Sequence, residues 1–238
     1  MGLLEIPTEL RMHIFEHLAD LSYGRDETIG PNVRLTPAIC RVCHTIRKET
    51  LPLYAKTSSF SIQTDDNLHV SNTRVQAWLQ ALGPTALSKV ENLHLSKHWK
   101  LKQPSRWQGH VGFYVRLQLV RKVWQCTAGT YPIANDMRGM RLESVDLLRH
   151  VILRQLRPAS AYTDLKCLTS SDVEFIINAM EIVASHPIPT FDTEQSEAGR
   201  QRRRGLWATM EGKVLALQAS FDEEANVQPR SKGFHTPY

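Results

Sequence analysis

Residues 111–119 alternate strictly between two kinds of side chain. Every second residue is apolar, and the residues between are polar or small: Val111, Phe113, Val115, Leu117 and Leu119 against Gly112, Tyr114, Arg116 and Gln118. Successive side chains of an extended chain point to opposite faces, so this run predicts a strand with one face on the core and one toward solvent. Half-buried strands of this kind are typical of antiparallel sheets.

Other runs supply partners for this strand. Residues 58–63 and 90–96 alternate in the same way, and residues 68–71 are a candidate partner of the first. Residues 121–130 are expected to return beside the central strand, although the spacing of Leu117, Val120 and Trp124 would also suit a helix.

Helical spacing dominates the rest of the chain. Asn72 and Gly83-Pro84 delimit one expected helix, which carries Trp78. Three apolar stripes follow, over residues 142–156, 173–183 and 206–221, with a capping box at residues 171–174.

We therefore predict an α+β fold, with an N-terminal helical segment, a small antiparallel sheet with a covering helix, and a helical C-terminal part. The expected organisation is a helical segment over residues 1–57, an α+β domain over 58–221 with the sheet ending near residue 130, and a polar, flexible tail over 222–238.

The N-terminal segment begins with a helix signal. Pro7 fits the first helical turn, where its missing N–H costs nothing. Leu10, Ile14, Leu18 and Leu21 recur at helical spacing and predict an amphipathic helix over residues 8–21. A polar link over 22–36 follows, and then Thr36-Pro37 predicts a second helix over residues 37–50 that Pro52 interrupts, with a short third turn at Leu53-Tyr54.

The run Leu-Leu-x-Ile-Pro-x-Glu-Leu over residues 3–10 resembles the first helix of an F-box. The run from Ile39 to Tyr54, with Cys-Arg-Val-Cys-His and Leu-Pro-Leu-Tyr, is similar to the second and third F-box helices of fungal F-box-like proteins, as is the strand around Phe60 that follows. The resemblance covers about residues 3–95.

An F-box buries exposed apolar residues against the Skp-type adaptor of a cullin-RING ubiquitin ligase. The resemblance thus implies a non-catalytic subunit that binds a Skp-type adaptor, and through it a cullin, recruits a target protein and needs no cofactor. It assigns adaptor binding to Ile6, Pro7, Leu10, Ile14, Leu18, Ile39 and Val42. No leucine-rich, WD or kelch repeat follows, so the class of target cannot be inferred.

Two departures from the F-box pattern leave a second interpretation open. Residues 22–36 form a link of fifteen residues where the compact F-box has a short turn, and Ile46 stands where many F-boxes carry Trp. The alternative is a self-contained intracellular structural or protein-interaction domain in which these helices are buried. Exposure of Leu10 and Ile14 distinguishes the two interpretations.

Two short motifs have metal-ligand spacing. His13-Ile-Phe-Glu16-His17 matches H-x-x-E-H, in which the histidines would bind zinc and the glutamate would act as base in a zinc hydrolase. These residues lie on the polar helix face with no evident third ligand, so two exposed histidines are the simpler interpretation.

Cys40-Arg-Val-Cys43-His44 matches the C-x-x-C-H of haem attachment. Cys43 falls on an apolar stripe, and therefore core packing is favoured over ligation. We expect no metal site.

Two basic segments are candidate contacts. Residues 97–102 combine lysines with Trp99, and Trp107 follows, which would suit single-stranded nucleic acid; a hairpin loop whose lysines protect a sheet edge is favoured, and nucleic acid is not an expected partner. Four arginines precede the last helical stripe and form a possible nuclear signal or anion patch: Arg200, Arg202, Arg203 and Arg204.

Bulk properties exclude other classes. The net charge of +5 and the hydrophobic content of 42% fit a globular chain, and no apolar run approaches the ~20 residues of a membrane span. No phosphate-binding glycine loop or G-x-S-x-G turn is present. The N-terminus lacks the features of a secretory signal, so we expect a cytoplasmic or nuclear protein with reduced cysteines and no membrane contact.

Overall fold

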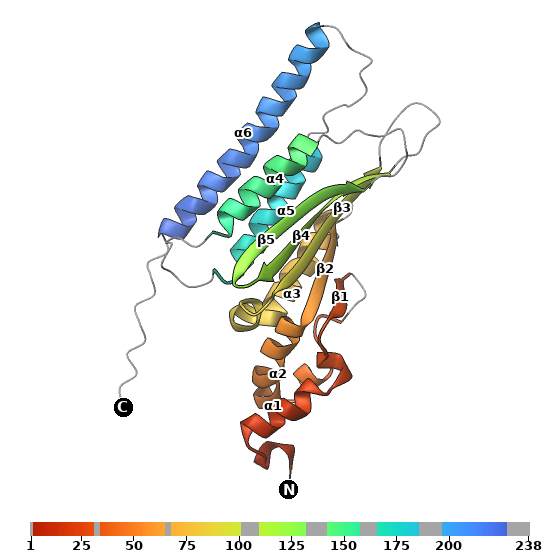
Figure 1. Ribbon diagram of the computed structural model, residues 1–238, viewed down its shortest axis with the longest axis vertical. Helices are drawn as coiled ribbons and strands as arrows, with labels where there is room; N and C mark the ends of the chain where they lie inside the picture. Colours follow the sequence, from red (N-terminus) through yellow and green to blue (C-terminus); the bar gives the residue numbers. More distant parts are fainter. Residues whose placement is uncertain are drawn as a thin grey trace.

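A five-stranded mixed sheet forms the centre of the computed structural model, which describes residues 2–30, 34–64, 68–100, 110–131, 142–157, 166–185 and 197–227. The strands lie side by side in chain order (Figure 1). Their bounds are β1 Arg25–Ile29, β2 Ser58–Thr64, β3 Asn92–Lys100, β4 His110–Val120 and β5 Val123–Tyr131.

The connections decide the direction of each strand. β1, β2 and β3 pair in parallel because long connections carrying α2 (His44–Thr57) and α3 (Leu68–Leu87) return the chain to the same end of the sheet. β3, β4 and β5 pair antiparallel. The predicted α+β class is confirmed. The predicted antiparallel sheet is correct for β3–β5 and wrong for the parallel half.

Helices cover one face of this sheet (Figure 1). They are α3, α4 (Leu142–Gln155) and α5 (Ser170–Ser185), with α6 (Glu197–Val227) packed against α4 and α5. The strand side chains beneath them are apolar and fully buried: Phe60, Ile62, Leu93, Leu95, Phe113, Val115 and Leu117. Within the described ranges, no helix combines the length and apolar character needed to span a membrane.

An aromatic cluster ties the first half of the chain together. The ring of Phe60 on β2 lies 5.4 Å from that of Tyr54 on α2 and 5.1 Å from that of Trp78 on α3, measured between centroids. All three side chains are buried. The edge-on and tilted arrangements are those that aromatic pairs favour.

The N-terminal segment differs most from the prediction. α1 spans Thr8–Glu16 and is preceded by a turn, η1 (Leu3–Glu5), and followed by another, η2 (Ala19–Leu21). The link predicted as loop contains β1. A third turn, η3 (Ile39–Arg41), replaces the expected start of the second helix.

Farther along the chain, the ends of α2 and α3 differ from the predicted ones. α2 passes through Pro52, which removes one hydrogen bond without ending the helix. Residues 68–71 belong to α3 rather than to a strand, and the chain kinks at Gly83, where φ is 68°.

The capping pair of α5 is two positions earlier than predicted. The N–H of Thr169 donates to Oδ2 of Asp172 at 3.0 Å, and the N–H of Asp172 donates to Oγ1 of Thr169 at 3.2 Å. α6 also runs past both ends of its predicted stripe, so residues 222–227 of the expected tail are helical and residues 228–238 lie outside the described part.

The expected domain boundary after residue 57 falls where α2 meets β2. Phe15, Leu21 and Cys40, on the N-terminal side of it, belong to the same cluster of buried side chains as the sheet residues. β1 also comes from this side and pairs with β2. The N-terminal segment therefore shares its core with the rest of the chain.

The β4–β5 turn carries backbone strain. Arg121 and Lys122 form a two-residue hairpin turn with φ values of 49° and 66°. Positive φ at both positions is the requirement of a type I′ turn, which favours Asn-Gly. Bulkier residues there cost about 1–2 kcal/mol each.

We predict that Arg121→Asn with Lys122→Gly raises the free energy of unfolding by about 1–2 kcal/mol, because both new residues accept positive φ. Urea unfolding of the two proteins measures the change. Arg121→Ala with Lys122→Ala is the control: it removes the same two charges but keeps the strain, and it should give no such gain. Equal gains in both variants would contradict the backbone explanation.

Candidate functional site

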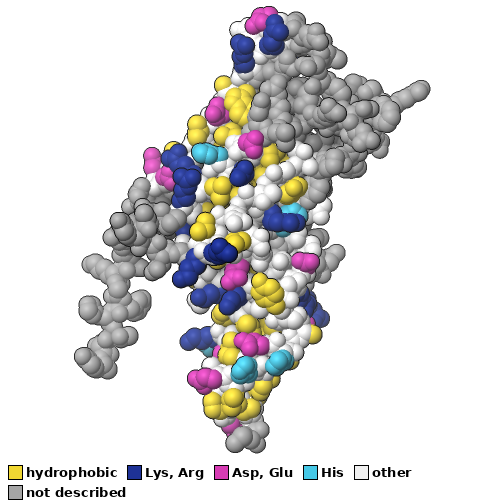
Figure 2. Space-filling view, in the orientation of Figure 1, with side chains coloured by type: hydrophobic (Ala, Val, Ile, Leu, Met, Phe, Trp, Pro, Cys, Tyr) yellow, Lys and Arg dark blue, Asp and Glu magenta, His cyan; other side chains and the backbone are white. Residues whose placement is uncertain are grey.

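Large apolar side chains are exposed at the N-terminal end of the molecule. Leu10 and Ile14 on α1 are 54% and 43% exposed, and Leu3 and Leu4 on the preceding turn are also exposed. Leu10 and Ile14 are four residues apart on one helix and so share a face. Figure 2 shows hydrophobic side chains gathered at the lower tip, where η1 and α1 lie. We call Leu3, Leu4, Leu10 and Ile14 the N-terminal apolar surface.

The sequence-predicted adaptor residues divide into two groups. Pro7, Leu10, Ile14 and Val42 are exposed, Val42 by 62%. Ile6 is half-buried, and Leu18 and Ile39 are half-buried against the core.

The predicted single stripe is therefore only partly correct. α1 ends at Glu16, so Leu18 and Leu21 leave its register, and Leu21 is fully buried on η2. Leu10 and Ile14 are the two stripe residues that face solvent.

The buried side of α1 is rotated by about 100° from Leu10 and Ile14. Phe15 and Arg11, again four residues apart, are the buried residues of the helix. Phe15 joins the core. Packing of α1 through this side leaves the side that carries Leu10 and Ile14 exposed.

Arg11 is the anchor of the N-terminal turn. Its guanidinium donates to both carboxylate oxygens of Glu49 on α2, with Nε to Oε2 at 3.0 Å. It also donates to the carbonyls of Leu4 and Ile6 and to Oγ1 of Thr8, the last at 2.9 Å. One buried cation therefore holds η1, α1 and α2 together. The sequence could not show this, because the partner lies 38 residues away and an arginine in an amphipathic helix is taken as part of its polar face.

The hydrogen bonds from Arg11, reinforced by its charge, hold the pKa of Glu49 below its ordinary value of 4.5, against the opposing effect of partial burial. A carboxyl group with a lowered pKa stabilises the folded state above the ordinary pKa. That contribution is lost as the pH falls through the lower pKa of the folded state.

We predict that Glu49→Gln is less stable than the wild type at neutral pH and that this difference shrinks below pH 4.5, where the wild-type carboxylate takes up its proton. Urea unfolding of both proteins across this range measures it. A difference that does not depend on pH would show that the carboxylate charge contributes nothing. Glu9→Gln, which changes an exposed acidic residue of α1, the helix that carries Arg11, is the control.

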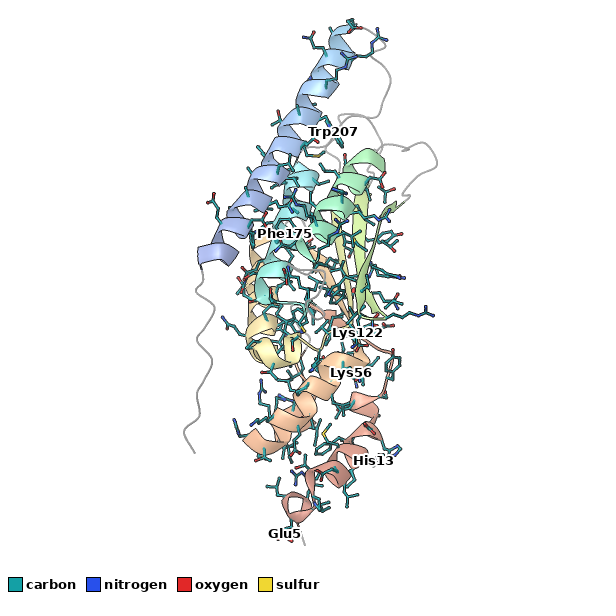
Figure 3. All side chains as sticks on the ribbon, turned by 60° about the vertical axis from the view of Figure 1, so that its left-hand side comes forward. Glu5, His13, Lys56, Lys122, Phe175 and Trp207 are labelled. Atoms are coloured by element: carbon teal, nitrogen blue, oxygen red, sulfur yellow. The ribbon has the colours of Figure 1, made fainter. Side chains whose placement is uncertain are left out.

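The H-x-x-E-H residues lie on the outer side of α1. Nδ1 of His13 is 3.4 Å from Oε2 of Glu16, and both side chains are exposed, as is that of His17. Figure 3 shows His13 at this surface. The described residues contain no group of three histidine, cysteine or acidic side chains that could hold a metal ion.

The two cysteines of the C-x-x-C-H run pack into the protein, as predicted, whereas His44 is exposed. Cys40 is buried, and its Sγ accepts a hydrogen bond from Oγ1 of Thr50 at 3.3 Å. Burial raises the pKa of the Cys40 thiol. Cys43 is half-buried against the core.

The two basic segments have different surroundings. Lys97 is buried, and its ammonium group forms an ion pair with the carboxylate of Glu181 on α5. Residues 101–109 lie outside the described part. Arg200, Arg202 and Arg204 are exposed, and Nη2 of Arg200 is 2.8 Å from Glu197. The arginine cluster lies within α6, not before it, and the side chain of Arg203 is outside the description.

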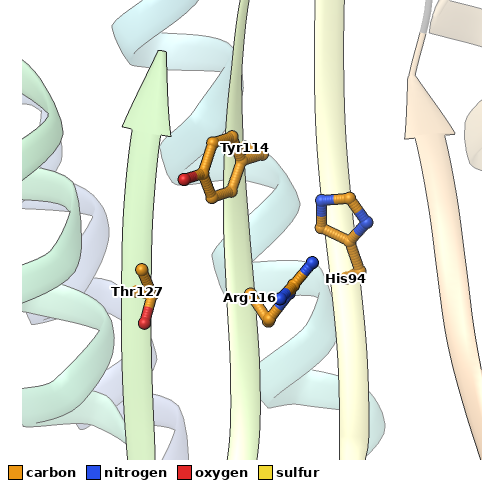
Figure 4. Close-up of a pocket in the computed structure, with 4 residues that line it drawn as sticks. All are labelled: His94, Tyr114, Arg116 and Thr127. Atoms are coloured by element: carbon orange, nitrogen blue, oxygen red, sulfur yellow. The ribbon is translucent and has the colours of Figure 1, made fainter. Parts of the chain in front are cut away.

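A second feature lies on the open face of the sheet. His94, Tyr114, Arg116 and Thr127 line a hollow there (Figure 4). The alternation of residues 111–119 already predicted that Tyr114 and Arg116 face outward. The partners His94 and Thr127 depend on strand register, which the alternation of residues 111–119 does not determine.

Comparison of the chain with protein-family models, curated proteins and solved structures yields no match. The F-box resemblance of residues 3–95 therefore stays a prediction.

Proposed function

We propose that this chain is a non-catalytic subunit that binds a Skp-type adaptor through the N-terminal apolar surface, and through it a cullin, and that it recruits a target protein for ubiquitin transfer in the cytoplasm or nucleus. The observation that carries the proposal is the exposure of Leu10 and Ile14 on a helix that packs against the protein through Arg11 and Phe15. Their residue pattern is the one that resembles an F-box.

The physical basis is burial of a helix face in a partner groove. Complete burial of a leucine or isoleucine side chain contributes about 1.5–3 kcal/mol, so covering the exposed parts of Leu10 and Ile14 contributes about 2 kcal/mol together. Leu3, Leu4 and Val42 are exposed as well and add to the apolar area available at this end of the chain. Single exposed leucines are ordinary on protein surfaces, whereas a group of them on a fixed helix favours an interface.

The alternative of a self-contained domain places these helices in the protein's own core. One face of α1 does pack there, through Phe15. That alternative, however, requires Leu10 and Ile14 to be buried, and about half of each side chain is exposed. Their exposure favours the adaptor proposal.

Co-expression with a Skp-type adaptor, followed by affinity pull-down, tests the proposal. We expect the wild type to retain the adaptor and Leu10→Asp with Ile14→Asp to lose it, with affinity about a hundredfold lower, because two carboxylates would be buried without partners. Pro7→Ala should bind nearly as well as the wild type.

Leu215→Asp is the matched control. Leu215 is a leucine of α6 that is 46% exposed, so its change adds a similar charge away from α1 and should leave adaptor binding intact. Circular dichroism establishes that every variant is folded. A folded wild type that fails to retain the adaptor, or a double variant that retains it, would overturn the proposal.

A further inference from the structure

The open face of the sheet is largely polar, apart from Val120 and Val123 beside the β4–β5 turn. The residues that alternate with the buried ones point to this side, opposite the helices, which lie behind the strands in Figure 4. They include Ser59, Ser61, Gln63, Asn92, His94, Tyr114, Arg116, Gln118, Gln125 and Thr127. Most are small or neutral, so a few larger side chains dominate the chemistry of this face.

Strand register brings three of these larger groups into one row. His94 on β3 is directly opposite Arg116 on β4, and Arg116 is directly opposite Thr127 on β5. Side chains at such positions have Cβ atoms about 4.5–5.5 Å apart. Tyr114 lies two residues before Arg116, with its ring centroid 5.8 Å from that of His94 in an edge-on arrangement.

The absence of a side chain at Gly129 leaves space for the ring of Tyr114 next to this row. A Cβ atom at Gly129 would lie 2.7 Å from the hydroxyl oxygen of Tyr114 and 2.8 Å from the ring carbon that carries it. The ring therefore reaches across β5 only because the opposing residue has no side chain. It forms one wall of the hollow, whose volume is about 170 Å³, compared with the ~30 Å³ that one water molecule occupies in the liquid.

All four lining side chains carry hydrogen-bond donors. Arg116 has a planar fork of N–H groups and a permanent positive charge, His94 has a ring N–H, and Tyr114 and Thr127 have hydroxyl groups. Among the described residues, no carboxylate lines the hollow. Arg116 is exposed and has no acidic partner among the described residues. By register, the nearest acidic residue of the open face is Asp26 on β1, two strands and about 10 Å from β3.

We propose that this hollow binds a phosphate monoester group. The donors come from three adjacent strands and line one hollow, and their number and the charge of Arg116 suit a dianion with three terminal oxygens. A carboxylate has two oxygens and one charge. Both oxygens would accept hydrogen bonds from the guanidinium of Arg116, which leaves fewer acceptor sites for the hydroxyl groups of Tyr114 and Thr127. The inference is independent of the proposed adaptor function.

The environment of His94 agrees with this assignment. Burial, and after it the charge of Arg116, lower the pKa of His94 from 6.5. A bound dianion would offset the effect of Arg116. The phosphate group itself has two possible sources, a free phosphorylated metabolite or a phosphorylated side chain of another protein, which share the same chemistry.

NMR titration of the full ¹⁵N-labelled chain tests the proposal, with inorganic phosphate, a phosphoserine peptide, glucose 6-phosphate and acetate as probes. We expect saturable shifts around the hollow with the phosphate probes and weaker binding of acetate. Arg116→Gln should weaken phosphate binding about tenfold or more, since it removes a charge-assisted contact. Thr127→Val, which keeps the side-chain shape, should weaken it by a smaller factor.

Arg121→Gln is the matched control, because it removes an exposed arginine from the turn of the same hairpin and should leave binding unchanged. Tighter binding of the phosphopeptide would identify a protein ligand, and tighter binding of the sugar phosphate a metabolite; either supports the proposal. It is overturned if the phosphate probes give no saturable shifts, if acetate binds equally well, or if folded Arg116→Gln binds like the wild type.

Discussion

The whole molecule depends on the fact that the sheet has one apolar face. The registers of β2, β3 and β4 align Phe60, Leu93 and Leu117 with their neighbours on the same side, and burial of this side against helices is the main apolar gain of folding. Because side chains alternate, the same constraint collects polar groups on the other face. The hollow around Arg116 is therefore a product of the packing that builds the core.

The N-terminal segment is joined to this core by two different kinds of contact. Apolar packing through Phe15 and Leu21, with the pairing of β1 to β2, attaches it to the sheet. The contact of Arg11 with Glu49 then sets how the first turn and helix lie against α2. Burial of an arginine is tolerated here because a carboxylate and two carbonyl oxygens accept its hydrogen bonds. A polar interaction thus determines which apolar side chains remain exposed.

Much of the fold was predictable because it follows local periodicity. The β4–β5 hairpin and the helices of the last third have clear alternating or helical patterns. The sequence does not predict β1, because Arg-Asp-Glu-Thr-Ile has one large apolar residue and resembles a polar link; its pairing with β2 makes it a strand. Residues 68–71 alternate between apolar and polar side chains as a strand would, yet they form the first turn of α3; Asn67 just before them is a residue type that favours a helix start.

Of the two sites, the outward positions of Tyr114 and Arg116 and the Leu10–Ile14 face could be read from spacing. The ion pair of Arg11 with Glu49 and the row of His94, Arg116 and Thr127 could not, because both depend on residues brought together from distant parts of the chain.

The shallow anchoring of α1 has a consequence for its dynamics. α1 has two buried residues among nine, whereas α5 has eight among sixteen. Segments with few buried contacts open at lower free energy than the global unfolding of the protein, and their amide hydrogens exchange sooner. The N-terminal apolar surface thus lies on one of the least protected parts of the molecule. A partner that covers it would do more than occupy a surface: by mass action it would hold closed a local opening that the isolated chain undergoes on its own.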